Sequence, residues 1–279
     1  LVATHITNVA VSYVLIFGGL GVEPMGAVGA GIGTTVALYF GSLLYFLQTW
    51  EHASKNGFLR ELPSRKVLGN ILSVGLPNSA QQFLFASSLI LLFFIIGLVG
   101  SDEVAVAHVL ITLVLFLILP AIGLGLSATS LVGQALGRQE PEDAYRWGWD
   151  VTRLAITVLL LLAIPMWLVP DWILGLFLHE PHLIELGRLP LMITGILVCL
   201  DGIAIVFTHA LLGAGAARSV MMVTLCVQFF FFLPAAYIMG PMLGFGLLGI
   251  WLMQATQRLL TSVWLGWLWV RRHWIHIEL

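Results

Sequence analysis

Residues 120–153, PAIGLGLSATSLVGQALGRQEPEDAYRWGWDVTR, contain the pattern that decides the fold. An apolar run rich in small residues reaches Gly137, a charged turn follows at residues 138–143, and a second helical pattern begins at Ala144. This order is typical of a helix that leaves a membrane, a tight turn in water, and a helix that re-enters. Lipid supplies no hydrophobic drive between membrane helices, so these helices associate through close van der Waals packing. Small residues allow that close approach. We expect such packing from Gly123, Gly125, Ser127, Ala128, Ser130 and Gly133.

The composition places the chain in a lipid bilayer. Of its 279 residues, 59% are hydrophobic and 9% are charged, whereas a soluble domain carries about 25% charged residues. So few charges could not cover the surface of a soluble domain. The formal net charge is -2, and no basic tract of the kind that binds nucleic acid is present. We therefore expect the protein to contact the lipid bilayer and not nucleic acid.

Eight apolar runs each approach the length of about 20 residues that a membrane-spanning helix needs. They cover residues 2–20, 27–50, 76–99, 104–127, 147–169, 186–212, 219–239 and 245–270, and the fourth helix is expected to continue to about 136. The chain is thus predicted to be an all-α, polytopic membrane protein with about eight transmembrane helices. The polar insert at residues 51–66 is predicted to be an amphipathic connector that lies on the membrane surface.

Positively charged residues gather on one side of the predicted membrane. Lys and Arg occupy the 51–66 connector, the turns near residues 138–153 and 218, and the end of the last run at Arg271 and Arg272. The opposite loops carry the acidic residues Glu23, Asp102, Glu103, Asp171, Glu180 and Glu185. Because cytoplasmic loops are enriched in Lys and Arg, we expect the connector and the C-terminus in the cytoplasm. The predicted location is the inner membrane of the cell, as a multi-pass protein.

The chain also contains a short internal similarity. After a shift of 220 residues, the GAVG at residues 26–29 aligns with the GLLG at residues 246–249, and Asn8 aligns with Gln228. The first two apolar runs then correspond to the last two of the six runs that follow Lys66. This pattern predicts two repeats of the same orientation, of the kind that are related by an axis along the membrane normal. It also predicts that four helices of a longer protein precede this chain.

Five short motifs resemble those of one transporter family. They are GLP at residues 75–77, VAVAH at 104–108, LVGQALG at 131–137, LGAG at 212–215 and GAVGAGI at 26–32. The chain resembles the multidrug and toxic compound extrusion (MATE) transporters, from their fifth helix to their twelfth. The resemblance covers essentially the whole chain, and LVGQALG together with the downstream LGAG is its most specific part.

The resemblance implies secondary active efflux, in which small organic and mostly cationic compounds leave the cell as H⁺ or Na⁺ enters. It implies two six-helix lobes with a central cleft, no cofactor beyond the coupling ion, and we expect a monomer when the protein is complete. The implied parts are the last two helices of an N-terminal lobe at 1–50, the cytoplasmic connector at 51–66 and a six-helix C-terminal lobe at 67–279.

Some positions depart from the family pattern. Gln81 and Gln82 lie near the place where some Na⁺-linked members carry a Glu, and Leu212 replaces an Arg. Ala217-Arg218 replaces an acidic–basic pair, and the first-helix carboxylate of many members has no counterpart here. These departures leave the coupling ion open between H⁺ and Na⁺, and they leave activity open as well.

Asp201 is the foremost candidate site residue because it lies near the middle of the 186–212 run. A charge at the centre of a membrane helix costs roughly 2.5–3.5 kcal/mol on insertion scales, so such residues usually face the bundle interior and bind or relay something. Asp201 precedes Gly213 by twelve residues, where members of the resembled family carry a cation-site Asp. We predict that Asp201 binds the proton or cation; the alternative is a structural ion pair or a protonated, hydrogen-bonded acid.

Arg258 is expected at a similar depth within the 245–270 run. Asp201 and Arg258 can therefore pair, which would lower the cost of burying both charges. A permanent pair would suit a structural role better than a role in transport. Arg258 is thus a candidate cleft or partner residue.

Several neutral or weakly basic side chains could line a polar cleft. Asn8, Gln81 and Gln228 could do so, and each could equally bond a neighbouring helix. His209 follows Asp201 by two helical turns, which places both on one helix face. A histidine with satisfied hydrogen bonds is the simpler interpretation of His209. Most tryptophans, Trp251 and Trp269 among them, are predicted to lie in the aromatic belts of the membrane interfaces.

Other classes of protein fit less well. A lipid-linked glycan flippase of the same superfamily should have a more basic cleft than Arg258 alone provides, and an inactive fragment is a further alternative. The HEPH at residues 179–182 lacks the spacing of a zinc-protease motif, and neither a G-x-S-x-G nor a phosphate-binding loop is present. Cys199 and Cys226 lie inside apolar runs, which favours buried thiols over a metal site. We therefore expect neither an enzyme nor a bound metal.

Overall fold

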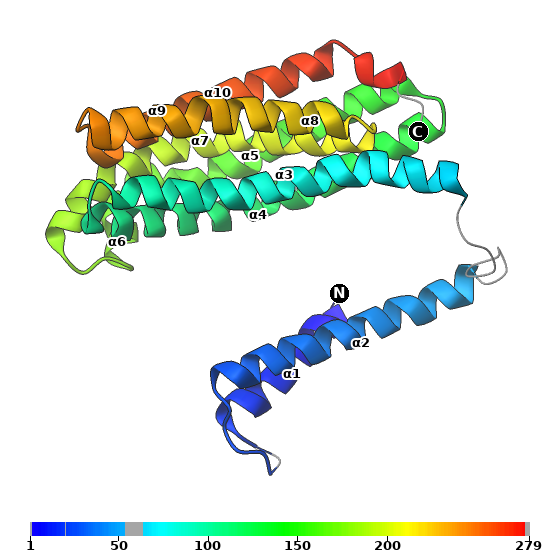
Figure 1. The fold of residues 1–279 in the computed structure, drawn as a ribbon, viewed down its shortest axis with the longest axis horizontal. Helices are drawn as coiled ribbons and strands as arrows, with labels where there is room; N and C mark the ends of the chain where they lie inside the picture. Colours follow the sequence, from blue (N-terminus) through cyan, green and yellow to red (C-terminus); the bar gives the residue numbers. More distant parts are fainter. Residues whose placement is uncertain (1, 20, 54–63, 277–279) are drawn as a thin grey trace. The chain divides into compact units, whose positions relative to one another are not determined.

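The computed structural model describes residues 2–19, 21–53 and 64–276, and their regular secondary structure is helical (Figure 1). The chain divides into two compact units, residues 1–68 and 69–279. The all-α class expected from the sequence is confirmed. Residues 54–63, which make up most of the predicted 51–66 connector, lie outside the described residues; on either side of them, one helix ends at Ala53 and the next begins at Arg65.

The first unit is a helical hairpin of α1 (Val2–Phe17) and α2 (Ala27–Ala53). A turn that contains an isolated bridge between Gly19 and Val22 joins the two helices. The helices approach so closely that a methyl group added at Gly29 would lie 2.5 Å from the carbonyl oxygen of Leu15. One turn further on, a methyl group at Gly33 would lie 2.8 Å from the Cα atom of Ser12. Glycines on α2 therefore set the distance between the helices.

The second unit begins with long helices joined by short turns. They are α3 (Arg65–Gly97), α4 (Ser101–Gly137), α5 (Pro141–Leu168), the short α6 (Pro170–Gly175) and α7 (Pro181–Gly213). The α4–α5 turn closes with a hydrogen bond from the Glu140 N–H to the Ala135 carbonyl, and Gln139 there has a φ of 63°. Pro141 then starts α5, where a missing N–H costs nothing. A turn was predicted at residues 138–143; an exposed turn is observed at residues 138–140, and α5 begins at Pro141, three residues before the expected start at Ala144.

The next segment is only partly α-helical. It consists of α8 (Ala217–Thr224), the π-helix η2 (Leu225–Phe232), α9 (Leu233–Tyr237) and the π-helix η3 (Ile238–Met242). In η2 the Leu233 N–H donates to the carbonyl of Gln228, five residues earlier. The next residue, Pro234, has no N–H, and in an α-helix its ring would collide with the Phe230 carbonyl. The wider π turn relieves that collision.

The chain ends with α10 (Gly246–Val270) and the 3₁₀-helix η4 (His273–His276). In the second unit, α7 packs against α4, α5 and α10 (Figure 1). The buried apolar side chains form two clusters along this bundle. One includes Ile96, Leu191 and Trp251, and the other includes Ala128, Phe207 and Trp269.

Helices form over all eight predicted apolar runs, but the runs do not mark the helix ends. Among the described residues, six helices are long and apolar enough to cross a membrane. The other two are α1, which has 16 residues, and α10, which carries Gln254, Gln257 and Arg258 near its middle. Since α3 begins at Arg65 and not at residue 76, its first turns extend beyond the apolar run.

The small residues expected to bring helices together do so only in part. Gly125 and Ala128 are buried, and a methyl group at Gly125 would lie 2.7 Å from the His209 ring of α7. Gly123, Ser127 and Ser130 are exposed. Gly125 and Ala128 therefore lie on the face of α4 that contacts α7, whereas Gly123, Ser127 and Ser130 lie outside this face.

Candidate functional site

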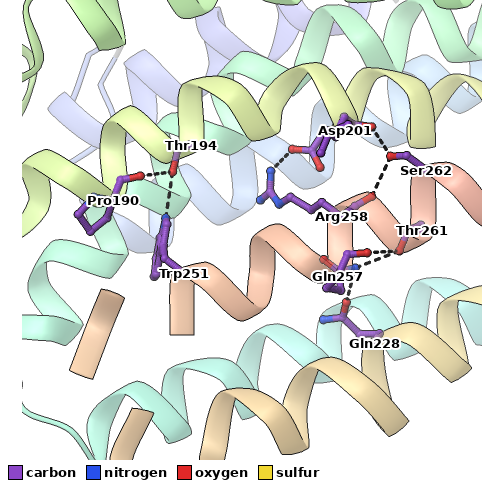
Figure 2. Close-up of polar contacts among 10 residues, drawn as sticks. Pro190, Thr194, Asp201, Gln228, Trp251, Gln257, Arg258, Thr261 and Ser262 are labelled. Carbon is purple, nitrogen blue, oxygen red and sulfur yellow. Dashed lines mark hydrogen bonds and ion pairs between the residues drawn. The ribbon is translucent and has the colours of Figure 1, made fainter. Parts of the chain in front are cut away.

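The centre of the second unit contains an ion pair between two helices. Nη1 of Arg258 on α10 donates to Oδ2 of Asp201 on α7 (Figure 2). The Arg258 side chain is 12% exposed and the Asp201 side chain is 17% exposed. The sequence placed these two charges at a similar depth, and the structure brings them together. Asp201 is therefore not an isolated buried acid.

The pair lies between the two apolar clusters. On α7, Val198 belongs to the first cluster and Val206 to the second, with Asp201 between them. On α10, Trp251 and Leu265 flank Arg258 in the same way. The charges therefore interrupt an otherwise apolar interface, where each would be costly without the other.

Hydrogen bonds fix α7 and α10 on both sides of the pair. The Ser262 hydroxyl lies 2.8 Å from the carbonyl oxygens of Leu200 and Arg258, one on each helix. Towards the other end, the Trp251 indole N–H donates to Thr194 Oγ1 at 2.9 Å, and Thr194 donates to the Pro190 carbonyl at 2.8 Å (Figure 2). These bonds hold Asp201 and Arg258 at one level, so the ion pair does not have to align the helices by itself.

A second polar contact joins α10 to the π-helix η2. Gln257, next to Arg258, donates through Nε2 to Gln228 Oε1 at 3.1 Å and lies 3.4 Å from Thr261 Oγ1 (Figure 2). Gln228 was a candidate cleft residue, and the structure shows it bonded to a neighbouring helix. Since Gln257 and Arg258 are consecutive, α10 links η2 to the ion pair.

His209 does not contribute to the ion pair. Its Nδ1 lies 2.8 Å from the Ile205 carbonyl, and its own carbonyl accepts a 2.8 Å hydrogen bond from Thr129 Oγ1 on α4. Its ring packs against Gly125. No hydrogen bond or ion pair between His209 and Asp201 occurs in the described part of the chain, and the observed contacts are those of a satisfied histidine.

The two remaining candidates lie elsewhere. Asn8, in the first unit, donates through Nδ2 to Thr34 Oγ1 on α2 at 3.3 Å. Gln81 is half-buried on α3, and no hydrogen bond that we find among the described residues involves its side chain. Asn8 therefore bonds its own hairpin, whereas Gln81 is the candidate whose amide is free to meet another group.

Sequence reasoning missed the residues that support the pair. Ser262 and Thr194 are almost fully buried, and Trp251 and Trp269 are 1% and 0% exposed. Both tryptophans pack into the apolar clusters and do not face outward, as residues of a lipid-facing aromatic belt would. No signal in the sequence marks these supporting residues, because Trp251 lies near the start of the 245–270 run and Ser262 lies one turn after Arg258. Within the described residues, no group of three or more potential metal ligands occurs.

Comparison with known proteins agrees with this architecture. The MatE family model matches residues 77–238, a range that includes Asp201. The chain is 28% identical over 256 residues to the probable multidrug resistance protein NorM of Thermotoga maritima, covering 89% of this chain and 54% of that protein. It is 29% identical over 281 residues to the probable NorM of Brucella suis, covering 97% of this chain and 59% of that protein.

A solved structure has the same fold. It is the outward-facing conformation of a multidrug resistance MATE family transporter of the MOP superfamily, with a TM-score of 0.85 and 22% identity. The alignment covers 99% of this chain and 62% of that one, so this chain spans little more than half the length of the proteins it matches. With more than half of its residues matched by the family model, this chain belongs to the MatE family.

Proposed function

We propose that the complete protein is a secondary active efflux transporter that exchanges small organic compounds, mostly cationic, for H⁺ or Na⁺. The observation that carries the proposal is the match of residues 77–238 to the MatE family model. The Asp201–Arg258 pair interrupts the apolar interface of α7 and α10, and the proposal requires this pair to open during the transport cycle. Such buried charges usually mark an ion pathway, a relay or a substrate site. The names of the NorM relatives support multidrug compounds as the class of substrate.

The proposed cycle uses Asp201 as the site of the coupling cation. A cation that binds the carboxylate takes the place of the Arg258 guanidinium, and its departure lets the pair form again. The two states differ at the α7–α10 interface, which Ser262 and the Trp251–Thr194 bond hold together. A ligand can shift a conformational equilibrium only by its difference in affinity for the two states. In this proposal the ion pair is the source of that difference.

A lipid-linked glycan flippase is less well supported. Its anionic substrate would need basic side chains in the cleft, and Arg258 is the cation expected there. That guanidinium is already bonded to Asp201. We further propose that the complete protein is a monomer in the inner membrane, with the C-terminus in the cytoplasm, since Arg271 and Arg272 follow α10.

The proposal is tested with Asp201→Asn in the complete protein, produced in a bacterium whose own efflux pumps are deleted. Asn keeps an oxygen that can accept a hydrogen bond from Arg258 but has no charge to exchange. We expect drug resistance, normalised to the amount of protein in the membrane, to fall to the level of the empty vector. Resistance equal to that of the unmodified protein would remove Asp201 from the mechanism.

Asp171→Asn is the matched control. Asp171 also pairs with an arginine, Arg188, at 3.5 Å, but its side chain is 55% exposed in the α5–α7 connection. Exposed pairs contribute only about 0–1 kcal/mol to stability. We expect this variant to keep full resistance. The comparison would show that the effect of Asp201→Asn comes from the buried pair and not from the loss of any Asp–Arg pair.

A further inference from the structure

The guanidinium of Arg258 occupies the position that a cation bound to Asp201 would need. Apart from Arg258, the sequence of α10 from Gly246 to Val270 contains no ionisable side chain. Arg258 is bonded to the Oδ2 atom of Asp201, and both side chains are largely shielded from water. The acid and the base together carry no net charge, so this part of the interface has no unbalanced negative charge to attract a metal cation.

Few other charges face the pair. Of the helices that pack against α7, α4 has no ionisable residue after His108 and α5 has none after Arg153. On α7 itself, the nearest ionisable side chains are Cys199 and His209. The Ser262 hydroxyl, one helical turn beyond Arg258 on α10, is bonded to two carbonyls.

The two possible coupling ions place different demands on this site. A proton needs one lone pair of the carboxylate and no coordination shell. A metal cation needs several oxygen ligands, in the way that hard cations generally do. It would also have to displace a guanidinium that is fixed to α10. The tethered guanidinium therefore disfavours a metal cation more than it disfavours a proton.

We propose that Arg258 is a tethered cation that holds the place of a metal ion at Asp201 and makes the site respond to protons in preference to Na⁺. Arg258 is then a specificity-determining residue. This inference rests on the proposed function, in which Asp201 is the coupling site. It predicts that removing the guanidinium while keeping the carboxylate converts the site into one that binds Na⁺.

The test measures Na⁺ binding without transport. The complete protein is purified in detergent, and its Tm is measured in NaCl and in choline chloride of equal ionic strength. We expect no Na⁺-specific shift for the unmodified protein. For Arg258→Gln we expect NaCl to raise Tm by about 2–4 °C at saturation, because a ligand that binds only the folded state stabilises it.

Two control variants isolate the cause. Arg258→Lys keeps a tethered positive charge, and Asp201→Asn with Arg258→Gln removes both charges. Neither should show a Na⁺-specific shift. A shift in the double variant would place the Na⁺ site elsewhere and overturn the inference. A Na⁺ shift in the unmodified protein that Asp201→Asn abolishes would show that Arg258 does not exclude Na⁺, and would overturn it as well.

The experiment remains decisive if Arg258→Gln folds poorly. If folded Arg258→Gln protein is recovered in NaCl but not in choline chloride, Na⁺ stabilises this variant, and the inference is supported. Loss in both salts, with the double variant recovered, would mean that Na⁺ cannot replace the guanidinium, and the inference would be wrong. The Tm measurement does not depend on efflux, so the efflux test of Asp201→Asn can fail while this test succeeds, and the reverse.

Discussion

Two helix hairpins of this protein share a backbone design and differ in what holds them together. The first is α1–α2, and the second is formed by the α8–η3 segment and α10. A glycine with positive φ lies at the start of each closing helix: Gly26, with a φ of 53°, directly precedes α2, and Gly246, with a φ of 60°, is the first residue of α10. Three residues later, methyl groups at Gly29 and Gly249 would lie 2.5 Å and 3.1 Å from carbonyl oxygens of the preceding segment. This common geometry agrees with the internal similarity of the sequence.

The contacts beyond these glycines are different. In the first hairpin α1 is α-helical throughout, and the glycines of α2 meet Leu15 and Ser12 directly. In the second hairpin the preceding segment contains two π-helical stretches, and α10 carries Gln257 and Arg258. At the shift of 220 residues, the counterpart of Arg258 is Leu38, a lipophilic side chain that is 62% exposed in the structure.

The difference teaches that a hairpin of this design does not need a charged side chain to close. Small residues, close backbone contact and one neutral Asn8–Thr34 hydrogen bond join α1 and α2, as expected for membrane helices. A buried ion pair is also weak evidence for stability, because desolvation opposes its Coulomb attraction. The polar residues of α10 are therefore better explained by a task other than closing the hairpin.

The largest expected effect comes from breaking the ion pair on one side only. Arg258→Ala should lower the free energy of unfolding by about 3–5 kcal/mol, because it leaves an unpaired buried carboxylate. Replacing both residues with apolar ones, Asp201→Leu with Arg258→Met, should be neutral or stabilising by about 1–4 kcal/mol. Unfolding of the complete protein by denaturing detergent, followed by tryptophan fluorescence, measures both.

Leu38→Ala is the matched variant in the first hairpin. Leu38 is 62% exposed within the first unit and makes no part of the α1–α2 contact described above, so we expect this change to alter the free energy of unfolding by less than about 1 kcal/mol, as for most exposed substitutions. If the double apolar variant were as unstable as Arg258→Ala, the pair would be structural. The contrast between the two hairpins would then lose its functional meaning.

A smaller effect is expected from closing the gap at Gly29. Gly29→Ala pushes a methyl group against the Leu15 backbone, and overpacking of this kind costs about 1–3 kcal/mol. Gly31→Ala is the control on the same helix, because no heavy atom lies within 4 Å of the added methyl group. Ala also favours a helix over Gly, so we expect Gly31→Ala to be neutral or slightly stabilising. The melting temperature of Gly29→Ala should therefore be lower than that of Gly31→Ala when the two variants are measured side by side.

The sequence predicted the depth of each charged residue but not its surroundings. Asp201 and Arg258 lie near the middle of apolar runs, so their pairing could be anticipated. The hydrogen bonds of Ser262 and Trp251 depend on the rotation of α10 against α7, which run length does not reveal. Trp251 was assigned to a membrane interface for the same reason, since position along a run says nothing about which face is buried.

Helix boundaries and the π turns were also beyond the sequence signal. Apolar runs report where lipid surrounds a helix, and α3 extends from Arg65 through several polar residues before its apolar run begins. The π-helix at residues 225–232 precedes Pro234, and a proline in an apolar run predicts a kink without specifying how the backbone accommodates it. By contrast, the α4–α5 turn was predictable, because charges, Gly137 and Pro141 all coincide there.

The smallest expected effect compares the corresponding polar bonds of the two hairpins. Gln228→Ala leaves the Gln257 amide of α10 without its 3.1 Å acceptor, and polar bonds within membranes contribute about 0.6 kcal/mol on average, with a maximum of about 1.7 kcal/mol. Asn8→Ala removes a 3.3 Å bond to Thr34 in a hairpin that glycines already hold, so its cost should be lower. Detergent-induced unfolding of the two variants gives the two costs directly. Equal costs would mean that the Gln257–Gln228 bond is ordinary helix packing, whereas a larger cost for Gln228 would show that the polar residues next to Arg258 act as one connected group.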